Sequence, residues 1–286
     1  MLTHAHAESI LPARVVVIGA GFVGNSIATA VQKRGVPVLA LKRGALDLLA
    51  DNAAVSLAKM LHADDSVVFV SAQAPARSSA QLILNLRMAE AVVKAVAAQP
   101  VAHLVYISSD AVYADDANPV TERSPVQPSS LHGMMHAARE LMLRAEAKVP
   151  LAILRPSLLY GAADPHNGYG PNRFRRLAAK GEAITLFGDG EEMRDHVLID
   201  DAAEIAALAL AHRSTGVLNI ATGVSTSFRK IAEAVVARAG RGEIKGTPRQ
   251  NPITHRHFDI TETLKAFPTF HYTPLSKGLE LAEKGA

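Results

Sequence analysis

A glycine-rich loop between a predicted strand and a predicted helix constrains the fold of this chain most strongly. Residues 14–18, RVVVI, are a run typical of a strand buried on both faces. GAGFVG follows at once, with Gly19, Gly21 and Gly24 in the spacing GxGxxG before a segment of helical periodicity. Gly19 permits a tight turn, Gly21 lets a pyrophosphate approach, and Gly24 lets the helix pack on the strand. The context predicts a dinucleotide site.

Further apolar runs extend this pattern along the first half of the chain. Strands are expected at 36–41, 66–72 and 102–109, with a long helix between the last two. Strands that alternate with helices form parallel βαβ units, with helices on both faces of the sheet. The predicted fold class is therefore α/β, a doubly wound parallel Rossmann sheet with a smaller C-terminal lobe.

A change in composition suggests where that lobe begins. The segment GAADPHNGYGPN, from residue 161, concentrates glycine, proline and asparagine in one loop. We expect a dinucleotide-binding domain at 12–165, to which 196–222 returns. The substrate-binding lobe is expected to consist of 166–195 and 223–286.

The end of the second predicted strand bears on which dinucleotide binds. NAD sites place a carboxylate about 20 residues beyond the glycines, to bind the ribose 2′-hydroxyl. Here Lys42 and Arg43 follow the strand, and the first carboxylate is Asp47. Two cations suit a 2′-phosphate, so NADP is favoured and NAD remains an alternative.

Composition excludes several classes of function. The 286 residues contain no cysteine, which rules out disulfides, thiolate catalysis and Cys-ligated metals. The net charge of +3 is small and scattered, so no nucleic acid partner is expected. The first twelve residues lack the pattern of a signal peptide, and no apolar run approaches a membrane span. We therefore expect a cytoplasmic protein.

Several blocks of sequence resemble a known family. SSDAVY (108–113), LRPSLLYG (154–161), MRDHVLIDD (193–201), GVLNIATG (216–223) and THRHFDITETLKAF (254–267) occur in its order and spacing. The chain resembles the extended short-chain dehydrogenase/reductases, in the NAD(P)-dependent epimerase/dehydratase branch. Most members act on sugars attached to nucleoside diphosphates. The resemblance implies a nucleotide-sugar epimerase or ketoreductase that transfers a hydride at a sugar carbon.

The resemblance also assigns residues to the cofactor. The family's earlier loop glycine is Ile18 here, and Asn85 matches a helix asparagine that steadies the strand end beneath the cofactor. The full set of positions that match cofactor-binding residues is Gly19, Gly21, Phe22, Val23, Gly24, Lys42, Arg43, Ala72, Gln73, Asn85 and Ser108.

Catalytic and substrate positions are assigned in the same way. Ser109 matches the serine or threonine that hydrogen-bonds the reacting oxygen, and Asp110 matches an acid found in dehydratases. The dehydratase glutamate that follows is Ala111 here, which removes support for dehydration. The residues that match contacts to the nucleotide's phosphates are Asn172, Arg194 and Arg256.

The family's YxxxK motif is replaced by HxxxH. The tyrosine position is His132 and the lysine position is His136, which face the same side of a predicted helix. In a working enzyme His132 exchanges the proton and His136 orients the ribose. Alternatively, the chain is a catalytically degenerate protein that binds dinucleotide and nucleotide-sugar as a sensor or partner subunit. A metal site is not expected, because no third ligand accompanies the pair.

A homodimer is also expected. The helices that contain Asn85 and His136 carry more than one apolar stripe, which suggests burial against both the sheet and a partner. The family commonly pairs through these helices. The apolar residues in question are Leu82, Leu86, Val93, Met134, Leu141 and Met142.

Overall fold

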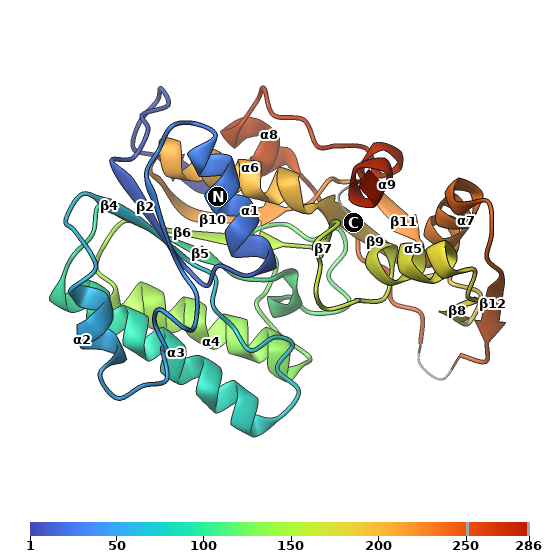
Figure 1. Ribbon diagram of the computed structural model, residues 1–286, viewed down its shortest axis with the longest axis horizontal. Helices are drawn as coiled ribbons and strands as arrows, with labels where there is room; N and C mark the ends of the chain where they lie inside the picture. Colours follow the sequence, from blue (N-terminus) through green and yellow to red (C-terminus); the bar gives the residue numbers. More distant parts are fainter. Residues whose placement is uncertain (250–251, 285–286) are drawn as a thin grey trace.

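The computed structural model describes residues 1–249 and 252–284 (Figure 1). The predicted C-terminal lobe, 223–286, therefore includes 250–251 and 285–286, which lie outside the described residues. Within the described ranges, no helix combines the length and the apolar character that a membrane crossing requires.

One large sheet forms the centre of the molecule. Its strand order is β1-β10-β6-β5-β4-β2-β3, and all neighbours are parallel except β1, which pairs antiparallel with β10. The strands predicted at 14–18, 36–41, 66–72 and 102–109 are confirmed, and the last three are shorter than expected. The strands are β1 (Leu2–His4), β2 (Arg14–Ile18), β3 (Val38–Leu41), β4 (Asp65–Phe69), β5 (His103–Ile107), β6 (Leu151–Pro156) and β10 (Ser214–Ile220).

Helices cover both faces of this sheet, so the predicted doubly wound Rossmann architecture is confirmed (Figure 1). Val16 and Val17 of β2 are fully buried but belong to different apolar clusters, Val17 with α1 and α6 and Val16 with α3. Successive side chains of a strand point to opposite faces, which is why β2 has no polar side. The helices here are α1 (Phe22–Gln32), α2 (Ala53–Ala58), α3 (Ser79–Ala98), α4 (Leu131–Glu146) and α6 (Ile199–Ala211).

The strand order places a topological switch beside the glycine loop. The first strand of the glycine-loop unit, β2, has β3 on one side and β4 on the other. In open α/β sheets, ligands bind outside the carboxyl ends of the strands at such a point. Within the described chain, α2 is the one regular element between β3 and β4, and β3 is the edge of the sheet.

A smaller group of elements lies to one side of the large sheet (Figure 1). Three strands pair in the order β11-β9-β7, and β8 pairs with β12. Tyr160, Phe174 and Phe228 are buried together in an apolar cluster of this region. The elements are β7 (Leu158–Tyr160), β8 (Ile184–Phe187), β9 (Met193–Leu198), β11 (Ser225–Ser227), β12 (Ile244–Thr247), α5 (Pro171–Lys180), α7 (Phe228–Ala239) and α9 (Leu275–Lys284).

The predicted domain boundaries stay a prediction. β9 runs across the expected border between residues 195 and 196. α8 (Thr261–Ala266), within the predicted lobe, packs against β1 and β10 of the large sheet, and Phe267 is buried in the apolar cluster under α1 and α6. The C-terminal segment thus contacts both parts of the molecule.

Candidate active site

The glycine loop joins β2 to α1 at the carboxyl edge of the large sheet. Gly19 has a φ of +106°, which residues with a side chain rarely adopt, and a Cβ atom there would lie 2.5 Å from the Ser71 nitrogen. A Cβ on Gly24 would overlap the carbonyl oxygen of Gly19, whereas a Cβ on Gly21 would meet open space. The loop is therefore packed against β4 and α1 but open at the helix N-terminus. This shape fits the pyrophosphate of a dinucleotide.

Phe22 and Val23 begin α1 and connect the loop to its surroundings. Val23 packs against the apolar cluster under α1 and α6. The ring of Phe22 lies close to Gly161, because a Cβ built on that glycine would be 3.3 Å from a ring carbon. The start of α1 thus contacts the segment between β7 and α5 in the smaller group of elements.

Lys42 and Arg43 follow β3 and are exposed. The Arg43 side chain is 74% exposed and pairs loosely with Asp47, at 3.4 Å between Nη2 and Oδ2. The backbone N–H of Leu49 also donates to Asp47, and this hydrogen bond, with the charge of Arg43, lowers the pKa of the carboxyl. Both cations remain accessible to an anion from solvent.

Asn85 holds the backbone that follows β4. Its Oδ1 accepts from the Gln73 N–H at 2.9 Å, and its Nδ2 donates to the carbonyls of Gln73 and Gln81 at 3.1 and 2.8 Å. Asn85 is fully buried in α3, while Ala72 and Gln73 are half-buried. The strand end beside the glycine loop is therefore fixed by a side chain from the following helix.

Ser109 and Asp110 form the turn after β5. The Ser109 hydroxyl accepts from the Ala111 N–H at 3.1 Å and caps a short 3₁₀ helix, η1 (Asp110–Val112). The Asp110 carboxylate lies 3.3 Å from Nη1 of Arg256. Burial raises the pKa of Asp110, and the neighbouring Arg256 charge counteracts this rise.

Ser108 belongs to a buried ionic network. Its hydroxyl donates to Oε1 of Glu140 at 2.6 Å. Glu140 accepts two hydrogen bonds from the guanidinium of Arg155, at 2.9 and 2.5 Å, and Arg155 also donates to the hydroxyl of Tyr113. Ser108 is 4% exposed, so its side chain supports the site from within and does not line the open side of the glycine loop.

His132 and His136 lie on one face of α4, at the end that packs against η1. Their rings meet edge to face with centroids 4.8 Å apart, and Nδ1 of His136 is 2.7 Å from the hydroxyl of Tyr106 on β5. Burial lowers the pKa of both histidines, and that of His136 falls well below its usual value. Because Tyr106 keeps its proton, with a pKa raised by burial to about 12, the phenol donates to a neutral His136.

His132 is less buried than His136. Nδ1 of His132 is buried and has no hydrogen-bond partner among the described residues. His136 is 6% exposed and already bonded to Tyr106. In the described chain no third ligand joins this pair, and the potential metal-binding group that occurs, His62 with Asp64 and Asp65, lies before and at the start of β4.

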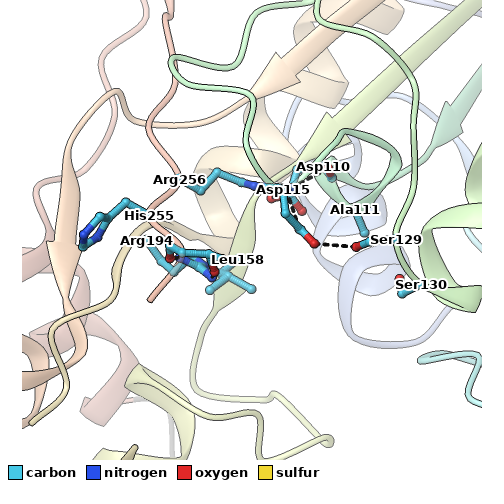
Figure 2. Close-up of a pocket in the computed structure, with 10 residues that line it drawn as sticks. Asp110, Ala111, Asp115, Ser129, Ser130, Leu158, Arg194, His255 and Arg256 are labelled. Carbon is cyan, nitrogen blue, oxygen red and sulfur yellow. Dashed lines mark hydrogen bonds and ion pairs between the residues drawn. The ribbon is translucent and has the colours of Figure 1, made fainter. Parts of the chain in front are cut away.

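A cavity of about 150 Å³ opens beside Asp110 and Ala111, in the turn after β5 (Figure 2). Figure 2 shows Asp110 and Asp115 directed toward Arg256, with Arg194 and His255 on the other side of the opening. The Ser129 hydroxyl donates to Asp115 at 2.6 Å. The lining residues are Asp110, Ala111, Asp115, Ser129, Ser130, Leu158, Arg194, Thr254, His255 and Arg256.

The two arginines predicted to bind phosphate both reach this cavity, but both are already hydrogen-bonded. Arg256 is 8% exposed and donates to Asp115 at 3.1 Å and to the carbonyl of Asp110 at 2.8 Å. Arg194 donates to the carbonyl and hydroxyl of Thr254. Burial lowers the pKa of Arg194. The structure thus brings both guanidinium groups together with two carboxylates at one opening.

Asn172 does not line this cavity. Its Oδ1 accepts from the Gly161 N–H at 3.0 Å, and its Nδ2 donates to the Leu159 carbonyl at 3.4 Å. The side chain is buried at the start of α5 and holds the backbone after β7. Its assignment as a phosphate contact stays a prediction, and the described hydrogen bonds use it as a brace for the loop.

Sequence reasoning did not identify several polar residues at the site. Glu140 lies four residues after His136, so helical spacing placed it on the same face, and Arg155 interrupts an otherwise apolar strand. Those two signals were available. Asp115 and Tyr106 carry no local pattern, because their partners Arg256 and His136 are distant in sequence.

The sequence was also compared with models of known protein families. The model of the NAD dependent epimerase/dehydratase family matches residues 15–221. A dTDP-L-rhamnose 4-epimerase of Burkholderia thailandensis is 33% identical over 153 residues, which are 50% of this chain and 42% of that protein. A putative UDP-glucose 4-epimerase of Methanocaldococcus jannaschii is 30% identical over 166 residues, 55% of this chain and 54% of that protein. The matches span about half the length of these relatives.

Solved structures share the fold over nearly the whole chain. A UDP-glucuronic acid 4-epimerase of Bacillus cereus, in complex with UDP-glucuronic acid and NAD, has a TM-score of 0.83 at 20% identity and covers 95% of this chain and 98% of that one. A UDP-glucose 4-epimerase of Thermotoga maritima with UDP-glucose has a TM-score of 0.82 at 21% identity, covering 95% and 97%. At these identities the similarity establishes the fold.

Proposed function

Because this chain belongs to the NAD-dependent epimerase/dehydratase family, we propose that it is a nucleotide-sugar enzyme that transfers a hydride at a sugar carbon, as an epimerase or a ketoreductase. The observation that carries the proposal is a cavity with Arg194 and Arg256 in its lining. Its other lining residues include Asp110, next to Ser109, and Ser130, the N-cap of the helix that carries His132. The names of the two curated relatives, both 4-epimerases of sugars on dTDP or UDP, support this substrate class.

His132 is proposed to move the proton. A neutral imidazole accepts a hydroxyl proton, and burial lowers the pKa of His132 so that it is neutral near pH 7. The Ser109 hydroxyl, at the N-cap of η1, supplies a hydrogen bond to the reacting oxygen. A bound nicotinamide dinucleotide supplies the hydride acceptor for the sugar C–H. His132 holds the proton until it returns to the carbonyl oxygen.

Arg194 and Arg256 are proposed to bind the diphosphate. A guanidinium fork binds two phosphate oxygens at once, and both forks reach the same cavity. Asp110 and Asp115 hold Arg256 before substrate arrives. A diphosphate must therefore compete with two carboxylates at Arg256. Arg194 has neutral partners at Thr254 and at the Met193 carbonyl, and one loose ion pair with Glu192.

NADP is proposed as the preferred dinucleotide. The steric fit of the loop around Gly19 and Gly24 supports a dinucleotide of either kind. Lys42 and Arg43 lie exposed after β3, where a ribose 2′-phosphate would sit. Asp47 is the nearest carboxylate in the sequence. It pairs with Arg43 and accepts a hydrogen bond from the Leu49 N–H, so it already has partners other than a ribose hydroxyl, which supports the choice of NADP over NAD.

A homodimer through α3 and α4 is proposed as the assembly. Met134 is 45% exposed and Leu141 67% exposed on α4, and Ile83 is 58% exposed on α3. Of the apolar residues named for these helices, Val93 is buried in the chain's own core, and Leu82, Leu86 and Met142 are partly exposed. Apolar side chains left uncovered on two packed helices support a partner at this face.

A substrate panel tests the proposed activity. The purified chain is incubated with UDP- and dTDP-linked hexoses and with NAD⁺ or NADP⁺, and new sugar isomers or oxidised sugars are measured by chromatography and NMR. We expect turnover of at least one nucleotide-sugar that is lost in His132→Ala. Dinucleotide binding without turnover of any panel member, in both wild type and variant, would replace the enzyme with the alternative: a dinucleotide- and nucleotide-sugar-binding protein.

A further inference from the structure

Arg139 is a buried cation on the same helix as the two histidines. It is 0% exposed and follows His136 by one turn of α4, on the face that carries His132. Every hydrogen bond that the structure gives it ends on a neutral group. Nε and Nη2 donate to the Asn85 carbonyl at 2.9 and 2.7 Å, and Nη1 donates to the Ser71 carbonyl at 2.8 Å.

Nη2 also contacts Sδ of Met88 at 3.7 Å, and two further contacts link the guanidinium to the dinucleotide edge. Nη2 also reaches Oδ1 of Asn85 at 3.0 Å, and the guanidinium lies over the ring of Phe69, 5.0 Å from its centroid. Ser71 is the residue against which Gly19 packs. Arg139 therefore ties α4 to α3 and to the end of β4 beneath the glycine loop.

The other charged groups around the histidines are already compensated. From β5, Tyr106 is neutral, because burial raises its pKa to about 12. Glu140 of α4 is paired with Arg155 of β6, and Asp110 of η1 is paired with Arg256. The charged side chains that α3 carries, Arg87, Glu90 and Lys94, are exposed. In the described part of the chain, Arg139 is the charge near the histidines that no carboxylate offsets.

We propose that Arg139 is a positioning residue: its guanidinium holds the histidine helix against the strand end under the dinucleotide, and its buried charge lies one turn from His136 on the face that also carries His132. The proposal rests on the proposed function for its catalytic consequence only. The arrangement is specific to this chain's own contacts, because the fork of Arg139 satisfies backbone carbonyls on two other elements, which a shorter or single-ended side chain cannot do at once.

The direction of the pKa values agrees with this geometry. Burial, first, and the charge of Arg139, second, lower the pKa of His132. Burial, the charge of His132 and the charge of Arg139 lower the pKa of His136. A base with a lowered pKa is active down to a lower pH, so the acid limb of turnover should lie below the ordinary imidazole value of about 6.5.

The test separates charge from packing. Arg139→Gln removes the charge and keeps an amide donor, whereas Arg139→Lys keeps the charge and loses the fork. Arg144→Gln is the matched control, because Arg144 lies on the same helix with a side chain 48% exposed and 3.6 Å from Glu140. The titration of the His132 ring proton is followed by NMR in protein without ligand, and the signal is assigned by its loss in His132→Gln.

We expect the His132 titration of the wild type to lie below about 6.5. It should move upward in Arg139→Gln and stay near the wild type in Arg139→Lys and Arg144→Gln. Arg139→Lys should instead weaken dinucleotide binding, because the fork to Ser71 and Asn85 is lost. A wild-type titration at or above the ordinary value, or no movement in folded Arg139→Gln, overturns the inference. Because burial also lowers the pKa of His132, a lowered wild-type value alone does not assign the effect to Arg139; if Arg139→Gln does not fold, Arg139→Met, which also removes the charge, takes its place in the same titration.

This readout is independent of turnover, so the inference and the proposed function can fail separately. If the His132 titration moves as expected but no nucleotide-sugar is converted, the effect of the Arg139 charge on His132 is supported and the proposed enzymatic activity is not. If conversion is observed with an unmoved titration, the enzyme stands and Arg139 has a packing role alone. When both hold, the acid limb of the turnover profile should rise in pH together with the titration in Arg139→Gln.

Discussion

The glycine loop and the histidine pair both lie at the carboxyl edge of the large sheet, but different physics constrains them. In the loop, atoms that would overlap exclude any side chain at Gly19 or Gly24. In the pair, burial keeps the ring of His136 neutral, and a phenol from β5 donates a hydrogen bond to it. The steric limit at Gly24 comes from the loop itself, whereas the limit at Gly19 comes from Ser71 after β4. The hydrogen bonding and the pKa values of the histidine pair come from groups and burial that the fold supplies.

The largest effect is expected from removing the imidazole of His132. His132→Ala should lower turnover by about 10²–10⁴-fold with little change in dinucleotide affinity, because it removes the proton acceptor and leaves the loop intact. Steady-state kinetics and a binding titration measure the two quantities. His62→Ala, an exposed histidine just before β4, is the control and should retain wild-type turnover. Equal loss of cofactor affinity in His132→Ala would count against a role in proton transfer.

Adding one methyl group at Gly24 tests the steric account of the glycine loop. Ala normally stabilises a helix over Gly by roughly 1 kcal/mol. Gly24→Ala should instead lower the free energy of unfolding by about 1–3 kcal/mol, because the added Cβ overlaps the Gly19 carbonyl oxygen. Urea denaturation measures the change. Gly21→Ala, where a Cβ meets open space, should change it by less than about 0.5 kcal/mol. Equal stability of the two variants would refute the steric account.

Lys42 and Arg43, after β3, lie at a third place on the carboxyl edge of the sheet and test the choice between NADP and NAD. Replacing Lys42 and Arg43 together by alanine should reduce the ratio of NADP to NAD affinity by about tenfold, because a charge-assisted contact to the 2′-phosphate is lost. Isothermal titration with both dinucleotides gives the ratio. Lys33→Ala, an exposed position at the end of α1, should leave it unchanged. An unaltered ratio in the double variant would leave NADP without support.

The smallest expected effect concerns assembly. Leu141→Glu should shift the proposed homodimer toward monomer, a twofold change in mass, because a carboxylate would be buried at the α3–α4 face. Light scattering at micromolar concentration measures the mass. Leu264→Glu, equally apolar and 49% exposed on α8, is the control. A wild-type protein that is already monomeric would remove the proposed interface.

Much of the fold followed from local pattern. The β-branched run at 14–18 and the apolar runs after it predicted β2 to β5, because strands buried on both faces need no polar residues. β1 was missed, since Leu2–His4 has no periodicity and is a strand only because β10 offers it an edge. Ser108 was assigned to the cofactor from the family resemblance and that role stays a prediction; the sequence did not indicate that its hydroxyl donates to Glu140.

The sequence alone determined the sheet, its winding and the edge at which a dinucleotide would bind. These depend on backbone sterics and on the period of apolar residues, which are properties of a short segment. Tertiary structure decided what the polar residues at that edge can do. The contacts of His136 with Tyr106 and of Arg256 with Asp110 join positions 30 and 146 residues apart. The charge of an imidazole or the freedom of a guanidinium depends on such neighbours and on burial, neither of which a local pattern contains.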